Sequence, residues 1–275
     1  MKNRISTFSL MSQLFFALIL SSCHKDYSPE IVVLKKGNLQ VNMVHQVDGK
    51  ALIFDSLTYT TSLGQHYMVN DLQYFLSDIS LHELDGSWLE ITDSAGIHYV
   101  DAETASSCQW LISQQIPAGT YDSIGFVFGL DKEANRSNRF PDPPERDMFW
   151  PDILGGGYHY MKMNMKWKKV GMPETMPFMF HIGIGQIYSG NTANPDSIIG
   201  FIQNYFSVKL PAVLRIDNNK SSSVEIAMNV DRWFDGQNAF DFSLYPMGIM
   251  QNQLGMYRAC RNGMQAFSVQ NAIPN

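Results

Sequence analysis

The stretch YHYMKMNMKW, residues 158–167, decides the fold class of this chain of 275 residues. Its histidine, methionines and tryptophan alternate strictly with tyrosines, lysines and an asparagine. Alternation with a period of two is typical of a β-strand, whose successive side chains point to opposite faces. One face would carry His159, Met161, Met163, Met165 and Trp167, and the other Tyr158, Tyr160, Lys162, Asn164 and Lys166. The stretch therefore predicts a strand in which His159 points the same way as the methionines.

Strand patterns of this kind recur along most of the chain. LQVNMVHQV (39–47) alternates and runs into an Asp48-Gly49 turn, and LQYFLSDISLHEL (72–84) runs into Asp85-Gly86. Further strands are expected in PAGTYDSIGFVFGLD (117–131) and at 178–184, 205–216 and 224–230, with a short helix at 231–234 and a long polar, proline-rich loop at 131–147. Many short strands separated by turns predict an all-β fold, an antiparallel β-sandwich with long loops and at most short helices.

The first residues have the pattern of a processing signal. Two basic residues precede the apolar run LFFALIL, which is too short to span a membrane, and LSSC follows and ends at Cys23. LSSC resembles a bacterial lipobox, which implies cleavage before Cys23 and lipidation of its thiol; an ordinary secretory signal is the alternative. We expect a signal peptide at 1–22, a tether at 23–36 and one domain at 37–275, anchored by lipid in the cell envelope at the outer membrane, facing the periplasm or the surface.

The composition and the absence of motifs exclude several classes of function. The formal net charge is −6, and no basic stripe is present that could neutralise phosphates, so we expect no nucleic-acid partner. The sequence holds no nucleophile elbow, phosphate-binding loop or dinucleotide fingerprint, and we expect no enzyme activity. Beyond Cys23 only Cys108 and Cys260 remain, and they either form a disulfide or are two buried thiols.

Four histidines are candidate metal ligands, since they stand in or beside predicted strands. His45 and His159 share a face with apolar neighbours, His181 falls on the face opposite Phe180, and His66 stands where a strand begins. Neutral imidazole binds copper and zinc, and a thioether adds affinity for Cu(I). The alternative is that these histidines are hydrogen-bonded core residues and that the methionines only fill space.

The order of segments resembles the MbnP-like family, proteins associated with methanobactin operons and with lipoproteins of Bacteroidetes. The resemblance covers most of 38–269 and is carried by VHQVDGKAL (44–52), LQYFLSDISL (72–81), PAGTYDSIGFVFGLD (117–131), MFWPDILGGGYHYMKM (148–163), FMFHIGIG (178–185) and VDRWFDGQNAFDF (230–242). It implies a β-sandwich that binds copper outside the cytoplasm. It also implies a partner, a di-haem enzyme of the MauG type, that oxidises a tryptophan to kynurenine in some members.

Carried over residue by residue, the resemblance assigns His181 as a copper ligand and Trp150 as the tryptophan beside the site. His45 and His159 match positions that only part of the family shares, and His66 is a further candidate. The cysteines of the methanobactin-linked members have no counterpart here, and Pro151-Asp152 replaces a tryptophan-containing segment.

These observations predict a lipid-anchored protein that binds copper, as Cu(I), for capture, storage or hand-over. The ligands would come from His45, His66, His159 and His181, with a thioether of Met161 or Met163 as a possible addition. The glycines at 155–157 would let the chain turn back and bring Trp150 over the strand of His159, beside His181. The alternative function is a metal-free surface lipoprotein that binds a glycan or a partner protein through exposed aromatic rings.

Overall fold

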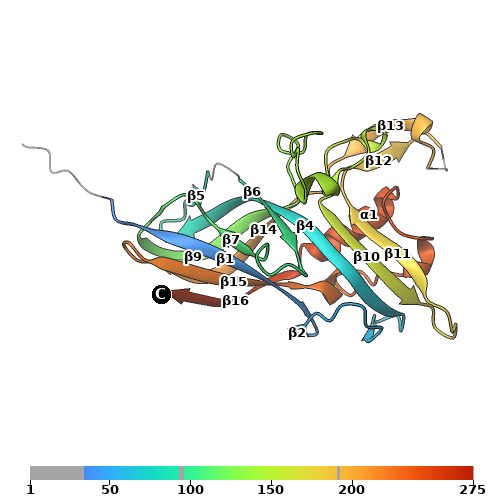
Figure 1. The fold of residues 1–275 in the computed structure, drawn as a ribbon, viewed down its shortest axis with the longest axis horizontal. Helices are drawn as coiled ribbons and strands as arrows, with labels where there is room; N and C mark the ends of the chain where they lie inside the picture. Colours follow the sequence, from blue (N-terminus) through green and yellow to red (C-terminus); the bar gives the residue numbers. More distant parts are fainter. Residues whose placement is uncertain (1–33, 93–95, 191–192, 275) are drawn as a thin grey trace, which may run out of the picture. The chain divides into compact units, whose positions relative to one another are not determined.

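The computed structural model describes residues 34–92, 96–190 and 193–274 (Figure 1). The predicted signal peptide, Cys23 and the tether up to residue 33 lie outside the described residues. Residues 34–275 form one compact unit, and its first strand begins at Lys36, the last residue of the predicted tether. Among the helices of the described residues, none has the length and apolar character needed to cross a membrane.

The larger sheet has eight strands and carries most of the core. Its main path runs β11–β10–β4–β9–β14, and β3, β5 and β6 also pair with β4. The strands are β3 (Tyr59–Thr60), β4 (His66–Glu83), β5 (Trp88–Glu90), β6 (Ile97–Asp101), β9 (Gly119–Phe128), β10 (Met161–Lys168), β11 (Met176–Ile182) and β14 (Phe206–Ile216). All of these pairings are antiparallel, as the sequence predicts.

A six-stranded sheet forms the second layer. Its path is β16–β15–β1–β2, with β7 and β8 also paired to β1. The strands are β1 (Lys36–Val47), β2 (Lys50–Ala51), β7 (Gln109–Leu111), β8 (Ile116–Pro117), β15 (Ser221–Asn229) and β16 (Phe267–Pro274). Asp48 and Gly49 both have positive φ in the predicted turn between β1 and β2. β1 and β15 pair in parallel, which the sequence pattern did not predict.

Short helices and one hairpin complete the fold. A separate two-stranded sheet consists of β12 (Gly185–Tyr188) and β13 (Ile198–Ile202). The 3-10 helices are η1 (Glu145–Met148), η2 (Asp152–Leu154), η3 (Pro195–Ser197), η4 (Val230–Trp233) and η5 (Phe242–Leu244). η4 matches the helix predicted at 231–234. An α-helix, α1 (Gln253–Gly263), was not predicted and contacts η4 and β12.

The two faces of β10 differ in their surroundings. Met161, Met163 and Met165 are buried, and in the register they stand opposite apolar residues of β11 and β4. The intervening residues Lys162 and Asn164 stand opposite polar residues of β4, and Lys162 stands opposite His181 of β11. The alternation thus predicts the core face of β10 and places His181 on the other face, as expected.

The chain between η1 and β10 folds over this second face. Gly155, Gly156 and Gly157 have φ of 117°, 72° and 78°, values that only glycine adopts readily, so the chain reverses here as predicted. A bridge between Phe149 and Tyr158 closes the reversal. β10 begins only at Met161, so the alternation predicted for 158–167 does not hold at His159. The prediction that His159 points with the methionines of β10 was wrong, because His159 precedes the strand and belongs to the reversal that the bridge closes.

Candidate metal centre

His159 and His181 lie against each other beneath the covering segment. Their ring centroids are 5.1 Å apart, and the ring planes are nearly perpendicular at 85°. Both side chains are buried, with 6% and 7% of their surface exposed. The hairpin of β10 and β11 brings His181 to this place, and the glycine turn brings His159. Two of the four predicted ligands are therefore brought together.

One nitrogen of each ring is fixed by a hydrogen bond. The Nδ1 of His159 lies 2.9 Å from the carbonyl oxygen of Met148, and the Nε2 of His181 lies 2.9 Å from the Oδ1 of Asn164. Since a carbonyl and an amide oxygen can only accept, both of these ring nitrogens carry the proton. The orientation of the Asn164 amide is set in turn by Asp71, whose two carboxylate oxygens accept from its Nδ2 at 3.0 and 2.9 Å.

The other nitrogen of each ring has no partner. The Nε2 of His159 and the Nδ1 of His181 are buried and accept no hydrogen bond. In the neutral tautomers described above, these are the nitrogens that hold a free lone pair, which is the state in which imidazole binds a metal. A buried polar atom without a partner costs about 1–3 kcal/mol, so two such atoms in contacting rings need an explanation.

Both imidazoles are held in the neutral form. Burial is the main reason that the pKa of His159 falls from 6.5 to about 4, and the positive charge of Lys162 contributes. The pKa of His181 falls to about 3, mainly through burial, with smaller contributions from the neighbouring His159 and Lys162. At neutral pH no proton competes for the free lone pairs.

Trp150 packs directly onto this pair. Its ring centroid lies 4.6 Å from that of His159 at an angle of 72°, and its side chain is fully buried. The indole Nε1 donates to the carbonyl oxygen of Leu154 at 3.1 Å. A Cβ at Gly183 would lie 2.7 Å from Cε3 of Trp150, so only glycine leaves room for the ring at this position. The predicted proximity of Trp150 to the histidines is thus found.

His45 and His66 do not join the pair. His45 lies in β1, and its Nε2 hydrogen-bonds with the hydroxyl of Tyr74 at 3.0 Å; burial lowers its pKa to about 4. His66 is exposed and stands opposite Lys168, whereas His181 stands opposite Lys162 of the same strand. Six residues of a strand span about 20 Å, so His66 is far from the site.

The other candidate soft ligands lie elsewhere in the fold. Met161 and Met163 are fully buried on the core face of β10, so the sheet itself separates their side chains from His181. Cys108 and Cys260 are free thiols, which answers the question of a disulfide between them. Within the described ranges, no three His, Cys, Asp or Glu side chains are grouped so that they could hold a metal ion. The site therefore rests on two imidazoles.

Three parts of this site were not identified from the sequence. The carbonyl of Met148, the amide of Asn164 and the carboxylate of Asp71 fix the histidine rings, but none belongs to a local motif. Asn164 and Asp71 are about ninety positions apart and meet only through the pairing of β10 with β4. The sequence could have indicated Asn164 only if the two strands 158–167 and 178–184 had been paired as a hairpin. In that hairpin Asn164 stands opposite Met179, two residues from His181.

Two comparisons with known proteins find a match to this chain. A family model described as MbnP matches residues 36–251, which is most of the chain. A solved structure, MbnP from Methylosinus trichosporium, is similar with a TM-score of 0.48 and 16% sequence identity, covering 74% of this chain and 80% of that chain. No curated protein matches. The chain belongs to the MbnP family.

Proposed function

We propose that this member of the MbnP family binds copper, as Cu(I), through the Nε2 of His159 and the Nδ1 of His181. The observation that carries the proposal is that these two buried nitrogens lack a partner while the opposite nitrogen of each ring is hydrogen-bonded. Ligand histidines commonly donate their other N–H to a carbonyl or a supporting side chain, which fixes the tautomer. Here the Met148 carbonyl oxygen accepts from His159 and the Asn164 amide oxygen accepts from His181.

The choice of metal follows from the ligands. Neutral imidazole suits copper and zinc, whereas magnesium and calcium require several oxygen ligands, and no metal-binding group of three that includes a carboxylate is found among the described residues. Zinc sites hold four ligands or three with a water, so a buried pair of imidazoles fits zinc poorly. The low pKa values of His159 and His181 keep both lone pairs free at neutral pH.

Trp150 is proposed to tune the site. Its indole touches His159, so its oxidation to kynurenine would place an aniline amine and a ketone beside a metal ligand. A di-haem enzyme of the MauG type is the proposed partner for that oxidation. Trp150 is fully buried, so such an enzyme would have to remove electrons through the protein without touching the ring.

The proposed cellular role is that of a binding protein without enzyme activity. It would be anchored through lipid on Cys23 in the cell envelope, at the outer membrane, and would capture, store or hand over copper. His45 and His66 are left out of the proposed ligand set, since His45 is bonded to Tyr74 and His66 lies on the surface.

The alternative, a metal-free protein that binds a glycan or a partner through aromatic rings, has less support. Among the described residues, Tyr257 is the one Tyr or Trp with a largely exposed side chain, at 56%. It stands on α1 and not on a flat sheet face. Two phenylalanines, Phe149 and Phe201, are also exposed, but a flat sheet face with exposed Tyr or Trp rings is missing from the described surface.

The test is competition for Cu(I) between the protein and a chromophoric chelator. We expect His181→Ala and His159→Ala each to lower the Cu(I) affinity by at least tenfold. His98→Ala is the control, because His98 is partly buried, stacks on Trp110 and bonds to the Ser107 carbonyl, but lies outside the pair. If His181→Ala binds Cu(I) as tightly as the parent protein, the proposed site is wrong.

A further inference from the structure

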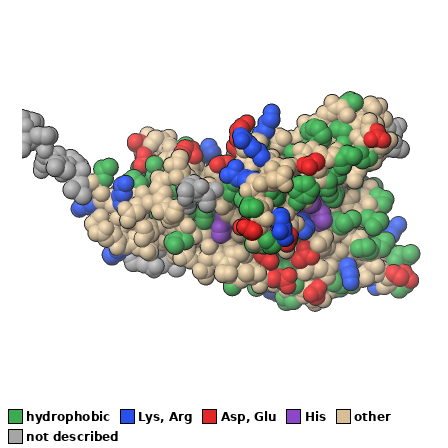
Figure 2. All heavy atoms as spheres, turned by 45° about the horizontal axis from the view of Figure 1, so that its top comes forward, with side chains coloured by type: hydrophobic (Ala, Val, Ile, Leu, Met, Phe, Trp, Pro, Cys, Tyr) green, Lys and Arg blue, Asp and Glu red, His purple; other side chains and the backbone are tan. Residues whose placement is uncertain are grey.

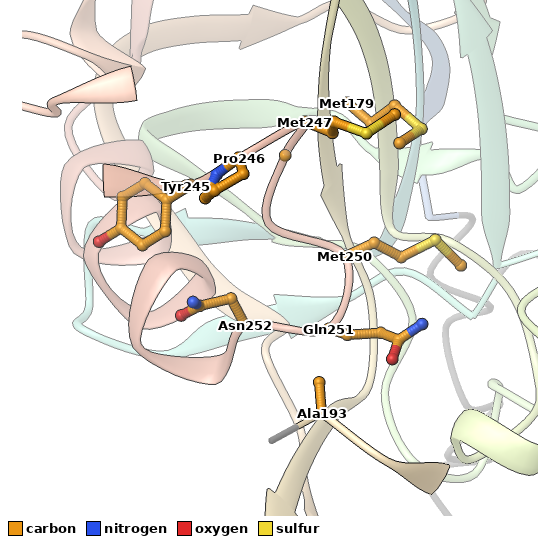
Figure 3. A pocket seen from close by; sticks show the side chains of 9 residues that line it. Met179, Ala193, Tyr245, Pro246, Met247, Met250, Gln251 and Asn252 are labelled. Atoms are coloured by element: carbon orange, nitrogen blue, oxygen red, sulfur yellow. The ribbon is translucent and has the colours of Figure 1, made fainter. Parts of the chain in front are cut away.

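Three methionines line one pocket beside β11. The pocket has a volume of about 300 Å³ and is lined by Met179, Met247 and Met250, together with Tyr245, Pro246, Gln251 and others. In Figure 3 the side chains of Met179 and Met247 overlap in this view, and that of Met250 lies apart from them and extends in the same direction. Figure 2 shows hydrophobic side chains gathered in the right-hand part of the view, where Figure 1 places β10–β13.

The exposure of these methionines is not explained by packing. Methionine commonly fills gaps in a core, as the fully buried Met161 does here. Met179 and Met247, however, leave 37% and 63% of their surface exposed. A thioether that reaches both the pocket and solvent is available as a ligand.

The backbone holds the two exposed methionines together. The N–H of Met179 donates to the carbonyl of Met247 at 2.9 Å, and the N–H of Ile249 donates to the carbonyl of Met179 at 3.1 Å. Met247 has a φ of 64°, which is uncommon for a residue with a side chain. Gly248 follows with a φ of 141°, and a Cβ there would overlap the carbonyl oxygen of Met179. The loop is thus shaped to lie against β11 at this residue.

We propose that Met179, Met247 and Met250 form a second metal site, which binds Cu(I) or another soft monovalent cation through thioether sulfur. Thioethers are soft ligands that select Cu(I) over harder divalent ions. They carry no proton to lose, so this site would not depend on pH as imidazole sites do. Binding at the methionines stands independently of the histidine pair.

The position of the pocket suggests how the two sites are related. Met179 and His181 are two residues apart on β11 and share the face that bears Asn164 and Lys162. Two residues of a strand span about 7 Å. The exposed thioethers would take up the ion and pass it to the buried imidazoles, a step that rests on the proposed function of the histidine pair.

The experiment uses Ag(I), a redox-inert analogue of Cu(I), with the full chain labelled with ¹³C at the methionine methyl groups. Single Met→Leu variants assign the signals, since leucine nearly conserves the volume. We expect the signals of Met179, Met247 and Met250 to shift on addition of Ag(I), and the triple Leu variant at these positions to bind one equivalent less than the parent protein. Met172→Leu/Met264→Leu, at two exposed positions outside the pocket, is the control and should bind as many equivalents as the parent.

The His159→Ala/His181→Ala variant separates the two proposals. In this variant the three methionine signals should still shift with Ag(I), while one equivalent of binding is lost. If the signals do not shift in either protein, or if the triple Leu variant binds as much Ag(I) as the parent, the thioether site is refuted. If instead the double histidine variant loses no equivalent, the histidine site fails and the thioether site stands.

Discussion

Replacing His159 with leucine should abolish tight copper binding and leave the metal-free protein about as stable as the parent at neutral pH. Leucine has a similar volume but no polar atom, so the change removes the unpartnered Nε2. Removing a buried polar atom that has no partner stabilises the folded protein by about 1–3 kcal/mol. For a histidine whose role is only structural, the same replacement should destabilise the fold.

The losses can be worked out from the contacts of the ring. The Nδ1–H bond to the Met148 carbonyl contributes about 0.5–1.5 kcal/mol, and the ring contact with Trp150 about as much. The Met148 oxygen keeps a partner, because the backbone N–H of His159 also donates to it at 2.6 Å. The stabilisation and the losses in the free energy of unfolding therefore cancel to within about 1 kcal/mol for His159→Leu.

The pH dependence gives a second and larger readout. The pKa of His159 is about 4 in the folded protein and 6.5 in the unfolded chain. Between these two pH values the imidazole is protonated in the unfolded chain but not in the folded protein. The contribution of His159 to the free energy of unfolding is therefore complete above pH 6.5 and is lost as the pH falls. At pH 4 the loss amounts to about 3 kcal/mol, since each pH unit is worth about 1.4 kcal/mol. The leucine variant should escape this loss.

Urea denaturation of the metal-free parent and variant at pH 7 and pH 4 measures both effects, and chelator competition measures the copper affinity. His98→Leu serves as the control for copper binding, because His98 lies outside the pair. A loss of more than about 2 kcal/mol at pH 7, together with unchanged copper affinity, would show that His159 is a structural residue and would refute the reasoning.

Three further predictions concern the surroundings of the pair. Gly183→Ala should destabilise the protein by about 1–3 kcal/mol in urea denaturation, because the new Cβ would press on Trp150; an unchanged midpoint would contradict the packing described here. Asn164→Leu should lower the Cu(I) affinity by about 10–100-fold, since the His181 ring loses the acceptor that fixes it, and an affinity equal to that of the parent would show that this support is dispensable. Trp150 in protein from its native host should carry the mass change of kynurenine, one oxygen gained and one carbon lost, and peptide mapping that finds only unmodified tryptophan would remove it from the proposal.

Much of the fold follows from local patterns, and the exceptions have identifiable causes. The alternation at 39–47 and 161–167 and the Asp48-Gly49 turn predict β1, β10 and the β1–β2 hairpin. The helix α1 was missed because its sequence, QLGMYRACRNG, contains two glycines, which have low helix propensity. The parallel pairing of β1 with β15 joins residues almost two hundred positions apart, and no local pattern encodes such a contact.

The candidate site was only partly predictable for the same reason. His181 and Trp150 were found through the resemblance, and the turn at Gly155–Gly157 through its composition. His45 has the same local appearance as His159, and His66 stands where a strand begins, and only the arrangement of the sheets shows that both lie elsewhere. A period of two assigns a face only while a strand continues, and at His159 the strand has not yet begun.

The strongest argument for a metal comes from hydrogen-bond satisfaction, which no sequence pattern reports. Among the described residues, three buried side-chain nitrogens lack a partner: His159 Nε2, His181 Nδ1 and Trp233 Nε1. The indole nitrogen of Trp233 is a donor only and cannot bind a metal through a lone pair. The other two belong to rings in contact with each other, and each has its opposite nitrogen fixed as a donor. If these histidines were only packing residues, two contacting rings would both carry an unsatisfied acceptor at a cost of about 1–3 kcal/mol each, whereas a bound cation satisfies both at once.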